Sequence, residues 1–414
     1  MAETLIGSEI VKLGNAINER IRQGETIYNF TIGDFNPKIF PIPAELEKAI
    51  HAAYEKGYTN YPAAEGNLAL RQAVGKFIQD REGLAFSPDE IQIASGGRPL
   101  IYALFRVLVD KGDKVIYGVP SWNNNHYVHL TQGEHCLIPC TPENDFMPSP
   151  ADIRAQIKDA ALVCLCTPQN PTGTTLSAAA LKEIGEIILA ENQRRGPAAK
   201  QCYLMFDQMY WTLTFGETVH ADPIGLNPAM KAYTIYIDGI SKVFAATGVR
   251  VGWALGPAHV MAKMKAILSH LGAWAPMAEQ IAVAEYLGQT QAIDRYLLSF
   301  KQAIALRLNG FYDGIMALKA QGHAVDAIAP QAAIYLTVKF DLVGLKTADG
   351  LLLADQAAVT DFILREAKVA IVPFSAFGAG KDSPWYRLSV GTAVAEDMPK
   401  VMANLAQALG QLKK

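Results

Sequence analysis

The sequence predicts an α/β fold: a large domain with a mostly parallel sheet flanked by helices, and a smaller α/β domain built from N- and C-terminal segments. Two observations lead to this prediction. Short apolar runs alternate with longer segments of helical periodicity. After Ala258 this alternation gives way to a long helical stretch of few glycines. Strands separated by helices need right-handed crossover connections, which place neighbouring strands parallel in one sheet.

The alternation can be followed along the first two thirds of the chain. The apolar runs that predict strands are residues 91–94, 114–117, 161–166, 202–206 and 234–237. The helical patterns between and before them are residues 68–79, 99–109 and 176–191, with a further helix starting at Ala44. Short apolar runs like these, of four to six residues, are typical of strands that are buried on both faces of a parallel sheet.

A helical stretch of few glycines, residues 259–322, is expected to link the sheet to the second domain. Strands of that domain are predicted at residues 333–340, 369–372 and 386–390. Residues 31–35 and the prolines at 41 and 43 read as a loop that packs with the C-terminal part. We therefore expect an N-terminal arm and part of the small domain at 1–45, the large domain at 46–290 and the small domain at 291–414.

Composition limits the function classes. The chain has 414 residues, of which 50% are hydrophobic, so its length is sufficient for two or three domains. Its net charge of −3 and the absence of a Lys/Arg-rich run argue against nucleic-acid binding through a basic surface. The N-terminus lacks a secretory pattern, and no apolar run approaches the roughly 20 residues of a membrane span, so we expect a cytoplasmic protein.

The five cysteines predict no metal site. They are odd in number, and Cys164 and Cys166 lie in an apolar run that reads as a buried strand. Since no His/Cys pair supplies further ligands at suitable spacing, core packing is the favoured interpretation.

Polar residues follow three of the predicted strands. Asn170 follows 161–166, Asp207 ends 202–206, and Ser241-Lys242 follows 234–237. Ligands of open parallel sheets bind at the carboxyl ends of the strands. Lys242 stands beside a hydroxyl and close to Arg250 in a turn of small residues, which suits an amine that reacts with an aldehyde while a phosphate is held nearby.

A glycine turn is a second candidate for phosphate binding. Gly96, Gly97 and Arg98 lie between the apolar run 91–94 and a helix that starts near Pro99. A helix N-terminus presents free N–H groups and a positive dipole end to an anion. Taken alone, the turn can equally be a plain tight turn. It matches neither GxGxxG nor a P-loop, so ATP is not implied.

Three motifs in this order resemble the class I/II aminotransferases. They are Asn170-Pro-Thr-Gly173, Asp207-x-x-Tyr210, and Ser241-Lys242 with Thr247-Gly248-x-Arg250. The resemblance covers nearly the whole chain and indicates the aspartate aminotransferase-like fold of pyridoxal-phosphate enzymes, fold type I. It implies that Lys242 forms a Schiff base with pyridoxal 5′-phosphate and then shuttles the substrate α-proton.

The resemblance also assigns the residues around the cofactor. Asp207 would hold the pyridine nitrogen protonated, Asn170 and Tyr210 would hydrogen-bond the phenolic oxygen, and Trp122 would stack on the ring. The phosphate would be held by the amides of Gly96, Gly97 and Arg98, the Ser241 hydroxyl and the Arg250 guanidinium. The residues themselves leave alternatives open: Asp207 suits a helix cap, and Trp122 suits core packing.

The same resemblance implies a homodimer with shared active sites, because Tyr61 matches a tyrosine that reaches the phosphate of the neighbouring subunit. Packing of Tyr61 beside Pro62 is the alternative. Arg387 matches the arginine that clamps the substrate α-carboxylate, and Gly33 matches a glycine whose backbone approaches it. A buried structural arginine and a glycine without function are the alternatives here.

The best hypothesis for the substrates is aspartate or glutamate and a 2-oxo acid. Arg98 stands where some aspartate aminotransferases carry a lysine that contacts the second carboxylate, while Trp122 and Asn170 would border the substrate. Aromatic or broad specificity remains open, as does a carbon–sulfur β-lyase on the same scaffold. A non-catalytic ligand-sensing module is disfavoured, since such modules follow a DNA-binding domain and the matched pattern begins within the first few dozen residues.

Overall fold

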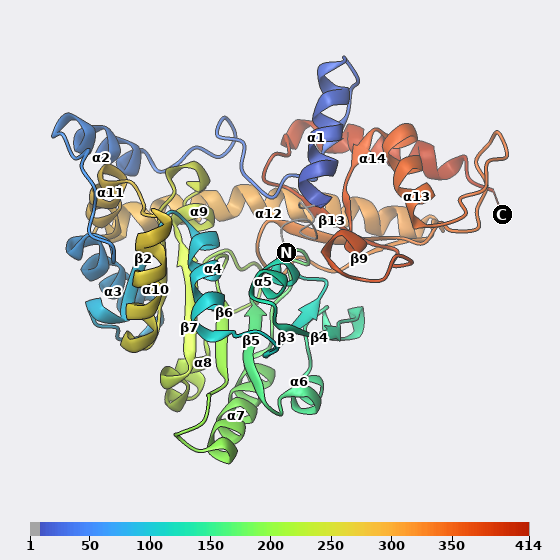
Figure 1. Ribbon diagram of the computed structural model, residues 1–414. Helices are drawn as coiled ribbons and strands as arrows, with labels where there is room; N and C mark the ends of the chain where they lie inside the picture. Colours follow the sequence, from blue (N-terminus) through green and yellow to red (C-terminus); the bar gives the residue numbers. More distant parts are fainter. Residues whose placement is uncertain (1–8, 414) are drawn as a thin grey trace.

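A seven-stranded sheet forms the centre of the larger part of the molecule (Figure 1). The computed structural model describes residues 9–413. The strands of this sheet, in chain order, are β2 (Ile91–Ala94), β3 (Lys114–Val119), β4 (Glu134–Pro139), β5 (Ala160–Cys166), β6 (Tyr203–Asp207), β7 (Thr234–Gly239) and β8 (Gly252–Leu255). Their spatial order is β2-β8-β7-β6-β5-β3-β4, and only β8 runs antiparallel to its neighbours. The mainly parallel sheet predicted from the sequence is confirmed.

Helices cover both faces of this sheet, which explains why its central strands are apolar throughout. Leu162 and Cys164 of β5 belong to a core formed with α4 (Gly97–Leu108), α5 (Asn124–Thr131) and α10 (Ala258–Leu271). Val163 and Leu165, which alternate with them, belong to the core of the opposite face. The helices of that second core are α2 (Ala44–Glu55), α3 (Leu68–Glu82), α6 (Pro150–Gln156), α7 (Ala178–Arg195), α8 (Pro223–Leu226) and α11 (Met277–Leu287).

A four-stranded antiparallel sheet forms the smaller part of the molecule. Its order is β12 (Val372–Pro373), β13 (Trp385–Ser389), β10 (Tyr335–Phe340) and β9 (Val325–Ala327). The helices packed around it are α1 (Glu9–Arg22), α13 (Gln356–Phe362) and α14 (Met398–Gly410). The expected strand at 369–372 is divided, because β11 (Val369–Ala370) leaves this sheet and pairs in parallel with β1 (Tyr28–Asn29).

The N-terminal loop packs with the C-terminal part, as its sequence suggested. The Ser389 amide donates to the Phe30 carbonyl at 3.0 Å, and the Asn36 amide donates to the Gly391 carbonyl at 2.9 Å. The loop between these contacts thus lies beside β13, at the edge where the large sheet meets the small one.

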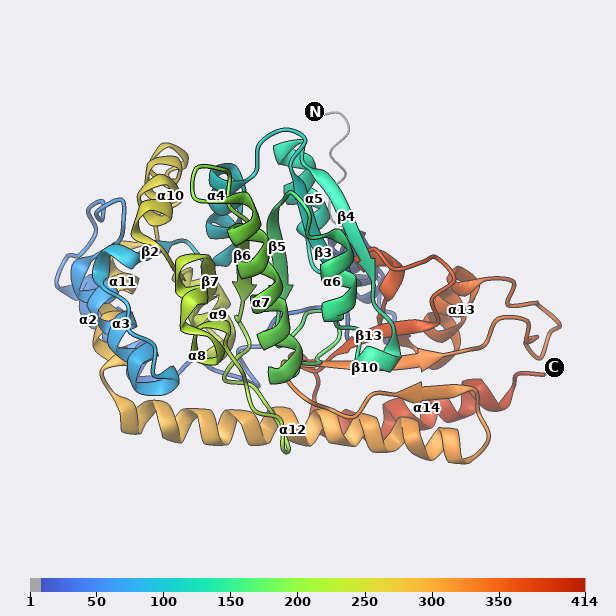
Figure 2. The same cartoon turned by 90° about the horizontal axis from the view of Figure 1, so that it is seen from below.

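The helical stretch expected at 259–322 consists of three helices, α10, α11 and α12. Gly272 ends α10 in the left-handed region at φ 63°, and Gly288 follows the last residue of α11. Only the third helix, α12 (Thr290–Ala320), connects the two parts, and Figure 2 shows it running along the molecule from the end near α2 and α11 to the end near α14. No helix in residues 9–413 is long and apolar enough to cross a membrane.

Candidate active site

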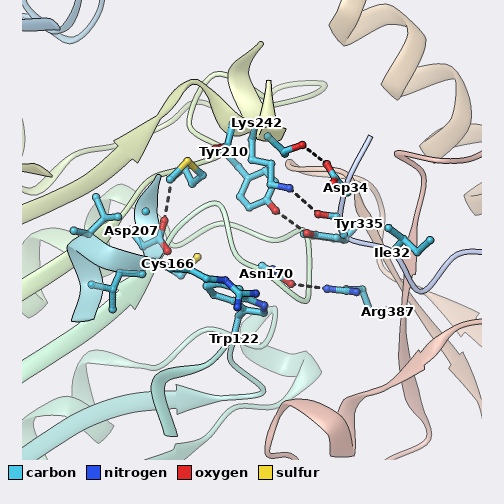
Figure 3. Close-up of a pocket in the computed structure, with 18 of the residues that line it drawn as sticks. Ile32, Asp34, Trp122, Cys166, Asn170, Asp207, Tyr210, Lys242, Tyr335 and Arg387 are labelled. Atoms are coloured by element: carbon cyan, nitrogen blue, oxygen red, sulfur yellow. Dashed lines mark hydrogen bonds between the residues drawn. The ribbon is translucent and has the colours of Figure 1, made fainter. Parts of the chain in front are cut away.

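A cavity of about 530 Å³ lies at the carboxyl ends of β5, β6 and β7, against the small sheet (Figure 3). Most of the candidate residues line it: Gly33, Gly97, Arg98, Trp122, Asn170, Asp207, Tyr210, Ser241, Lys242, Arg250 and Arg387. Two others, Gly96 and Tyr61, are not among the described lining residues. The chain therefore brings together side chains that are separated by up to 354 positions, from Gly33 to Arg387.

Lys242 lies in the single turn of α9 (Ile240–Val243), directly after β7. Its Nζ donates a hydrogen bond of 2.6 Å to the Gly33 carbonyl. Burial lowers the pKa of this amine to about 8, opposed by the Asp34 carboxylate and reinforced by the nearby arginines, of which Arg387 has the largest effect. A substantial fraction of the amine is thus neutral, and nucleophilic, at mildly alkaline pH.

Asp207 is the last residue of β6 and is partly exposed to the cavity. Its Oδ1 accepts from the Met209 amide at 3.1 Å, so one oxygen does cap the following turn. No hydrogen bond to Oδ2 is present among the described residues. Burial raises the pKa of this carboxyl to about 6, and a bound cation would lower the pKa again. Asp207 is consequently suited to face a protonated nitrogen.

Arg387 is 2% exposed and has no carboxylate partner in the described part of the chain. Its Nη1 donates to Asn170 Oδ1 at 3.0 Å and its Nη2 donates to the Thr31 carbonyl at 2.6 Å, while Nε has no partner. A buried charge without a counter-ion costs several kcal/mol. Nε is buried, but Nη1 and Nη2 each keep one N–H group, which is sufficient for a two-point contact with a carboxylate.

Asn170 is oriented by this contact. Because its Oδ1 accepts from Arg387, its Nδ2 is left as a donor toward the cavity. The turn that carries Asn170 is held against the small sheet, since a Cβ added at Gly173 would lie 2.1 Å from the Tyr335 carbonyl oxygen and Gly173 has φ 70°. Only glycine fits here, so the position of Asn170 depends on both sheets.

A candidate anion site lies at the start of α4. The first helical amides, Gly97 and Arg98, have no intrahelical acceptor, while Pro99 has no N–H. Ser241 is 8% exposed and lines the same part of the cavity with Arg250. The Arg250 guanidinium is held in place by the Thr247 and Ser95 carbonyls, both at 2.7 Å.

Gly96 contributes by its lack of a side chain. A Cβ at this position would lie 2.4 Å from Arg250 Nη2, and its φ of 93° is unfavourable for other residues. The glycine turn therefore makes space for the arginine, a role that the sequence analysis did not assign to it.

Arg98 and Trp122 stack on one another at the side of the cavity. The Arg98 guanidinium carbon lies 4.7 Å from the centre of the Trp122 ring. Arg98 is exposed and forms no salt bridge with a described carboxylate. Its charge is therefore oriented by an aromatic face yet remains available for a ligand.

The structure adds residues that the sequence analysis missed. Tyr335 donates to or accepts from Tyr210 through a hydroxyl contact of 2.6 Å, and Thr247 donates to Asp34 Oδ1 at 2.7 Å. Figure 3 shows the contact between Tyr210 and Tyr335 and the position of Asp34. A glycine before Asp34 was the only sequence signal for that residue, and nothing in the apolar strand around Tyr335 marked its hydroxyl as functional.

Tyr61 lies outside the cavity of its own chain. It is 81% exposed, and its ring packs edge-on against Trp274 with centroids 5.1 Å apart. Within its own chain Tyr61 thus contacts Trp274, and its role toward a second chain stays a prediction.

The residues of the cavity fit the cofactor expected from the sequence. Four cations line it, Arg98, Lys242, Arg250 and Arg387, against two acids, Asp34 and Asp207. One amine, one partly buried carboxylate, and a helix N-terminus beside an arginine are the features that an aldehyde, a ring nitrogen and a phosphate require. No group of three or more metal-ligating side chains is found in residues 9–413.

Comparison with known proteins supports the same chemistry. The family model "Aminotransferase class I and II" matches residues 25–405. An aspartate aminotransferase of Geobacillus stearothermophilus is 30% identical over 92% of this chain and 91% of its own. The crystal structure of the aspartate aminotransferase from Rhizobium meliloti has a TM-score of 0.90 at 27% identity, with 99% and 98% of the two chains covered. The aspartate aminotransferase from Thermus thermophilus with maleate has a TM-score of 0.87 at 25% identity, with 99% and 98% covered.

Proposed function

The chain belongs to the class I and II aminotransferases, and on this basis we propose that it transfers the amino group of aspartate or glutamate to a 2-oxo acid, with Lys242 as the proton-transferring base. Pyridoxal-phosphate-dependent amino transfer between an amino acid and an oxo acid is the activity of this family. The observation that carries the finer proposal is the buried Arg387 without a counter-ion, in one cavity with Lys242, Asp207 and a second unpaired cation, Arg98.

Each residue has one task in this proposal. When bound, pyridoxal phosphate draws electrons away from the substrate Cα and so makes its proton acidic. Lys242 Nζ removes that proton and returns it on the cofactor side, which requires a neutral amine and agrees with its lowered pKa. Asp207 Oδ2 keeps a proton on the pyridine nitrogen.

The remaining residues bind and orient. Asn170 Nδ2 and Tyr210 Oη donate to the phenolic oxygen, and Trp122 packs on the ring. Ser241, Arg250 and the amides of Gly97 and Arg98 hold the phosphate, with Gly96 making space for Arg250. Arg387 binds the α-carboxylate beside the backbone of Gly33, whose carbonyl already accepts from Lys242.

We propose Arg98 as the residue that selects dicarboxylates. Its guanidinium is exposed to the cavity, stacked on Trp122 and free of a described carboxylate. The Thermus thermophilus relative was solved with maleate, which is a dicarboxylate. A second fixed cation, besides the one that binds the α-carboxylate, suits the side-chain carboxylate of aspartate or glutamate.

Arg98→Met is expected to lower kcat/KM for aspartate and glutamate by about 10- to 100-fold, the equivalent of one lost charge-assisted hydrogen bond, and to leave alanine and phenylalanine nearly unchanged. Arg106→Met, on the exposed side of the same helix, is the matched control. Steady-state kinetics with all four amino donors make the test. Equal losses for all four donors would show that Arg98 acts on the cofactor and not on the substrate side chain.

The β-lyase alternative is separable by its products. A lyase releases ammonia and pyruvate from a cysteine conjugate without an oxo-acid acceptor, whereas amino transfer stops after one half-reaction until 2-oxoglutarate or oxaloacetate is added. Multiple turnover without an acceptor would overturn the proposed reaction.

We further propose a cytoplasmic homodimer with three segments per subunit, 1–45, 46–290 and 291–414. The large exposed ring of Tyr61 beside Trp274 supports a contact with the partner subunit. Mixing an inactive Lys242 variant with an inactive Tyr61→Ala variant is expected to restore part of the activity in mixed dimers, because one hybrid site then contains both native residues. A monomer in sedimentation experiments at working concentration contradicts the dimer, and a membrane-bound or secreted pool on cell fractionation contradicts the location.

A further inference from the structure

Tyr335 places a second phenol inside the active site. It is the first residue of β10, it is 1% exposed, and its Oη lies 2.6 Å from Tyr210 Oη. Figure 3 shows the two side chains pointing toward each other, one from the turn after β6 and one from the small sheet. Their rings meet edge-on, with centroids 5.6 Å apart and planes at 68°.

The position of the Tyr335 hydroxyl is fixed from several sides. The Arg387 guanidinium carbon lies 4.7 Å from the centre of the Tyr335 ring. A Cβ added at Gly33 would lie 2.8 Å from Tyr335 Oη, so the hydroxyl is close to the backbone that accepts from Lys242. The carbonyl oxygen of Tyr335 is packed still more closely on Gly173. The hydroxyl therefore cannot move away from Tyr210 without displacing the loops that form the site.

The two hydroxyls of Tyr210 and Tyr335 carry two hydrogens, and only one of them is used between the two side chains. Burial raises the pKa of both phenols, so each carries its hydrogen at neutral pH. The contact between the two oxygens uses one hydrogen. Neither hydroxyl forms another hydrogen bond with the described residues, so the second hydrogen is left for a ligand in the cavity.

We propose that Tyr335 is a positioning residue whose hydroxyl donates to Tyr210 Oη and thereby directs the Tyr210 hydrogen to the phenolic oxygen of the cofactor. The inference rests on the proposed role of Tyr210. If Tyr210 donates to the cofactor, its oxygen is free to accept, and Tyr335 is the donor within reach. Two hydrogen bonds in series polarise one another, which strengthens the second by roughly 10–30%.

The expected consequence is a shift in a spectroscopic pKa. A donor at the phenolic oxygen withdraws negative charge from the neighbouring nitrogen on Lys242, and so lowers the pH midpoint at which the visible absorption of the resting enzyme changes. Tyr335→Phe keeps the ring on Arg387 but removes the donor. We expect its midpoint to rise by about 0.1 to 0.6 pH unit, whereas Tyr210→Phe raises it by more.

Tyr386→Phe is the matched control. Tyr386 is a fully buried phenol on the neighbouring strand β13, and its hydroxyl bonds Gln356 and Thr360 outside the cavity. Its loss is expected to lower the thermal midpoint without changing the spectroscopic one. Absorption titrations of the four holoenzymes, with thermal unfolding alongside, make the comparison.

The double variant, Tyr335→Phe in the Tyr210→Phe background, shows whether Tyr335 acts through Tyr210. If Tyr335 acts through Tyr210, Tyr335→Phe adds no further shift in the Tyr210→Phe background. An equal shift in both backgrounds, or none in the wild type while Tyr210→Phe shifts the midpoint, overturns the inference and leaves the proposed function standing. No shift in Tyr210→Phe itself contradicts the proposed role of Tyr210, which is a separate failure.

Discussion

Lys242→Ala is expected to lower the rate of amino transfer on the order of 10⁴-fold, the upper part of the range for a positioned acid–base group. The side chain is the amine at the carboxyl end of β7, and its Nζ is held 2.6 Å from the Gly33 carbonyl inside the cavity. No other lysine lines this cavity among the described residues. The measurement is the single-turnover rate at which aspartate bleaches the visible absorption of the enzyme.

Two controls separate chemistry from folding. Lys76, an exposed lysine of α3 that pairs with Asp80, can be replaced by alanine with no expected effect on the rate. Borohydride treatment of the native enzyme is expected to fix the cofactor on the peptide that contains Lys242. A Lys242→Ala enzyme that retains more than about a tenth of native activity would contradict the assignment.

The pH dependence gives an independent measurement of the same amine. Burial places its pKa near 8, and only the neutral amine attacks an aldehyde. The rate at which cofactor-free protein combines with pyridoxal phosphate is therefore expected to rise with pH and to level off above pH 8. A midpoint near 10.4, the value of a solvated lysine, would show that Lys242 is not held in this environment.

Asp207→Ala is expected to lower kcat by at least about 10²-fold while changing cofactor affinity much less. In the proposed function the carboxylate stabilises a proton on the pyridine nitrogen, and the loss of one charge-assisted hydrogen bond corresponds to about 3 kcal/mol. Cofactor binding is expected to survive, because the phosphate contacts proposed for Ser241 and Arg250 do not involve Asp207. Kinetics and a cofactor-binding titration of the same protein make the test.

A kinetic isotope effect tests where the rate is lost. With α-deuterated aspartate, the effect is expected to increase in Asp207→Ala, because proton removal becomes the slow step. Asp207→Glu retains the charge and is expected to recover part of the rate. An unchanged isotope effect together with a large loss of cofactor affinity would mean that Asp207 supports binding and not electron withdrawal.

The local pattern of apolar residues was sufficient to predict most strands of the large sheet. Residues 161–166 and 234–237 are apolar without interruption because helices cover both faces, and this signature does not depend on distant contacts. The strands missed were β4 and β8. β4 alternates buried and exposed residues at the edge of the sheet, and β8 begins at a glycine in a run that reads as part of the Arg250 turn.

Some residues of the candidate site could be recognised from the local sequence and others could not. Asn170, Asp207 and Lys242 could be recognised because each follows an apolar strand, and strand ends of a parallel sheet meet at one edge. Tyr335 could not, since its hydroxyl differs from a core phenol only by the presence of Tyr210, 125 positions away. Asp34 could not be recognised either, because its link to the site is the hydrogen bond from Thr247, 213 positions away in the sequence.

The sequence by itself therefore determined the α/β architecture, the family chemistry and the residues at the strand ends, because these depend on local hydrophobic pattern and short motifs. Only the tertiary structure decided which donors remain free. Arg387 keeps three unused N–H groups because Asn170 and Thr31 take the other two, and the Tyr210–Tyr335 pair keeps one free hydrogen because the contact between their hydroxyls uses the other. Hydrogen-bond capacity is set by neighbours in space, and no pattern within a single segment specifies them.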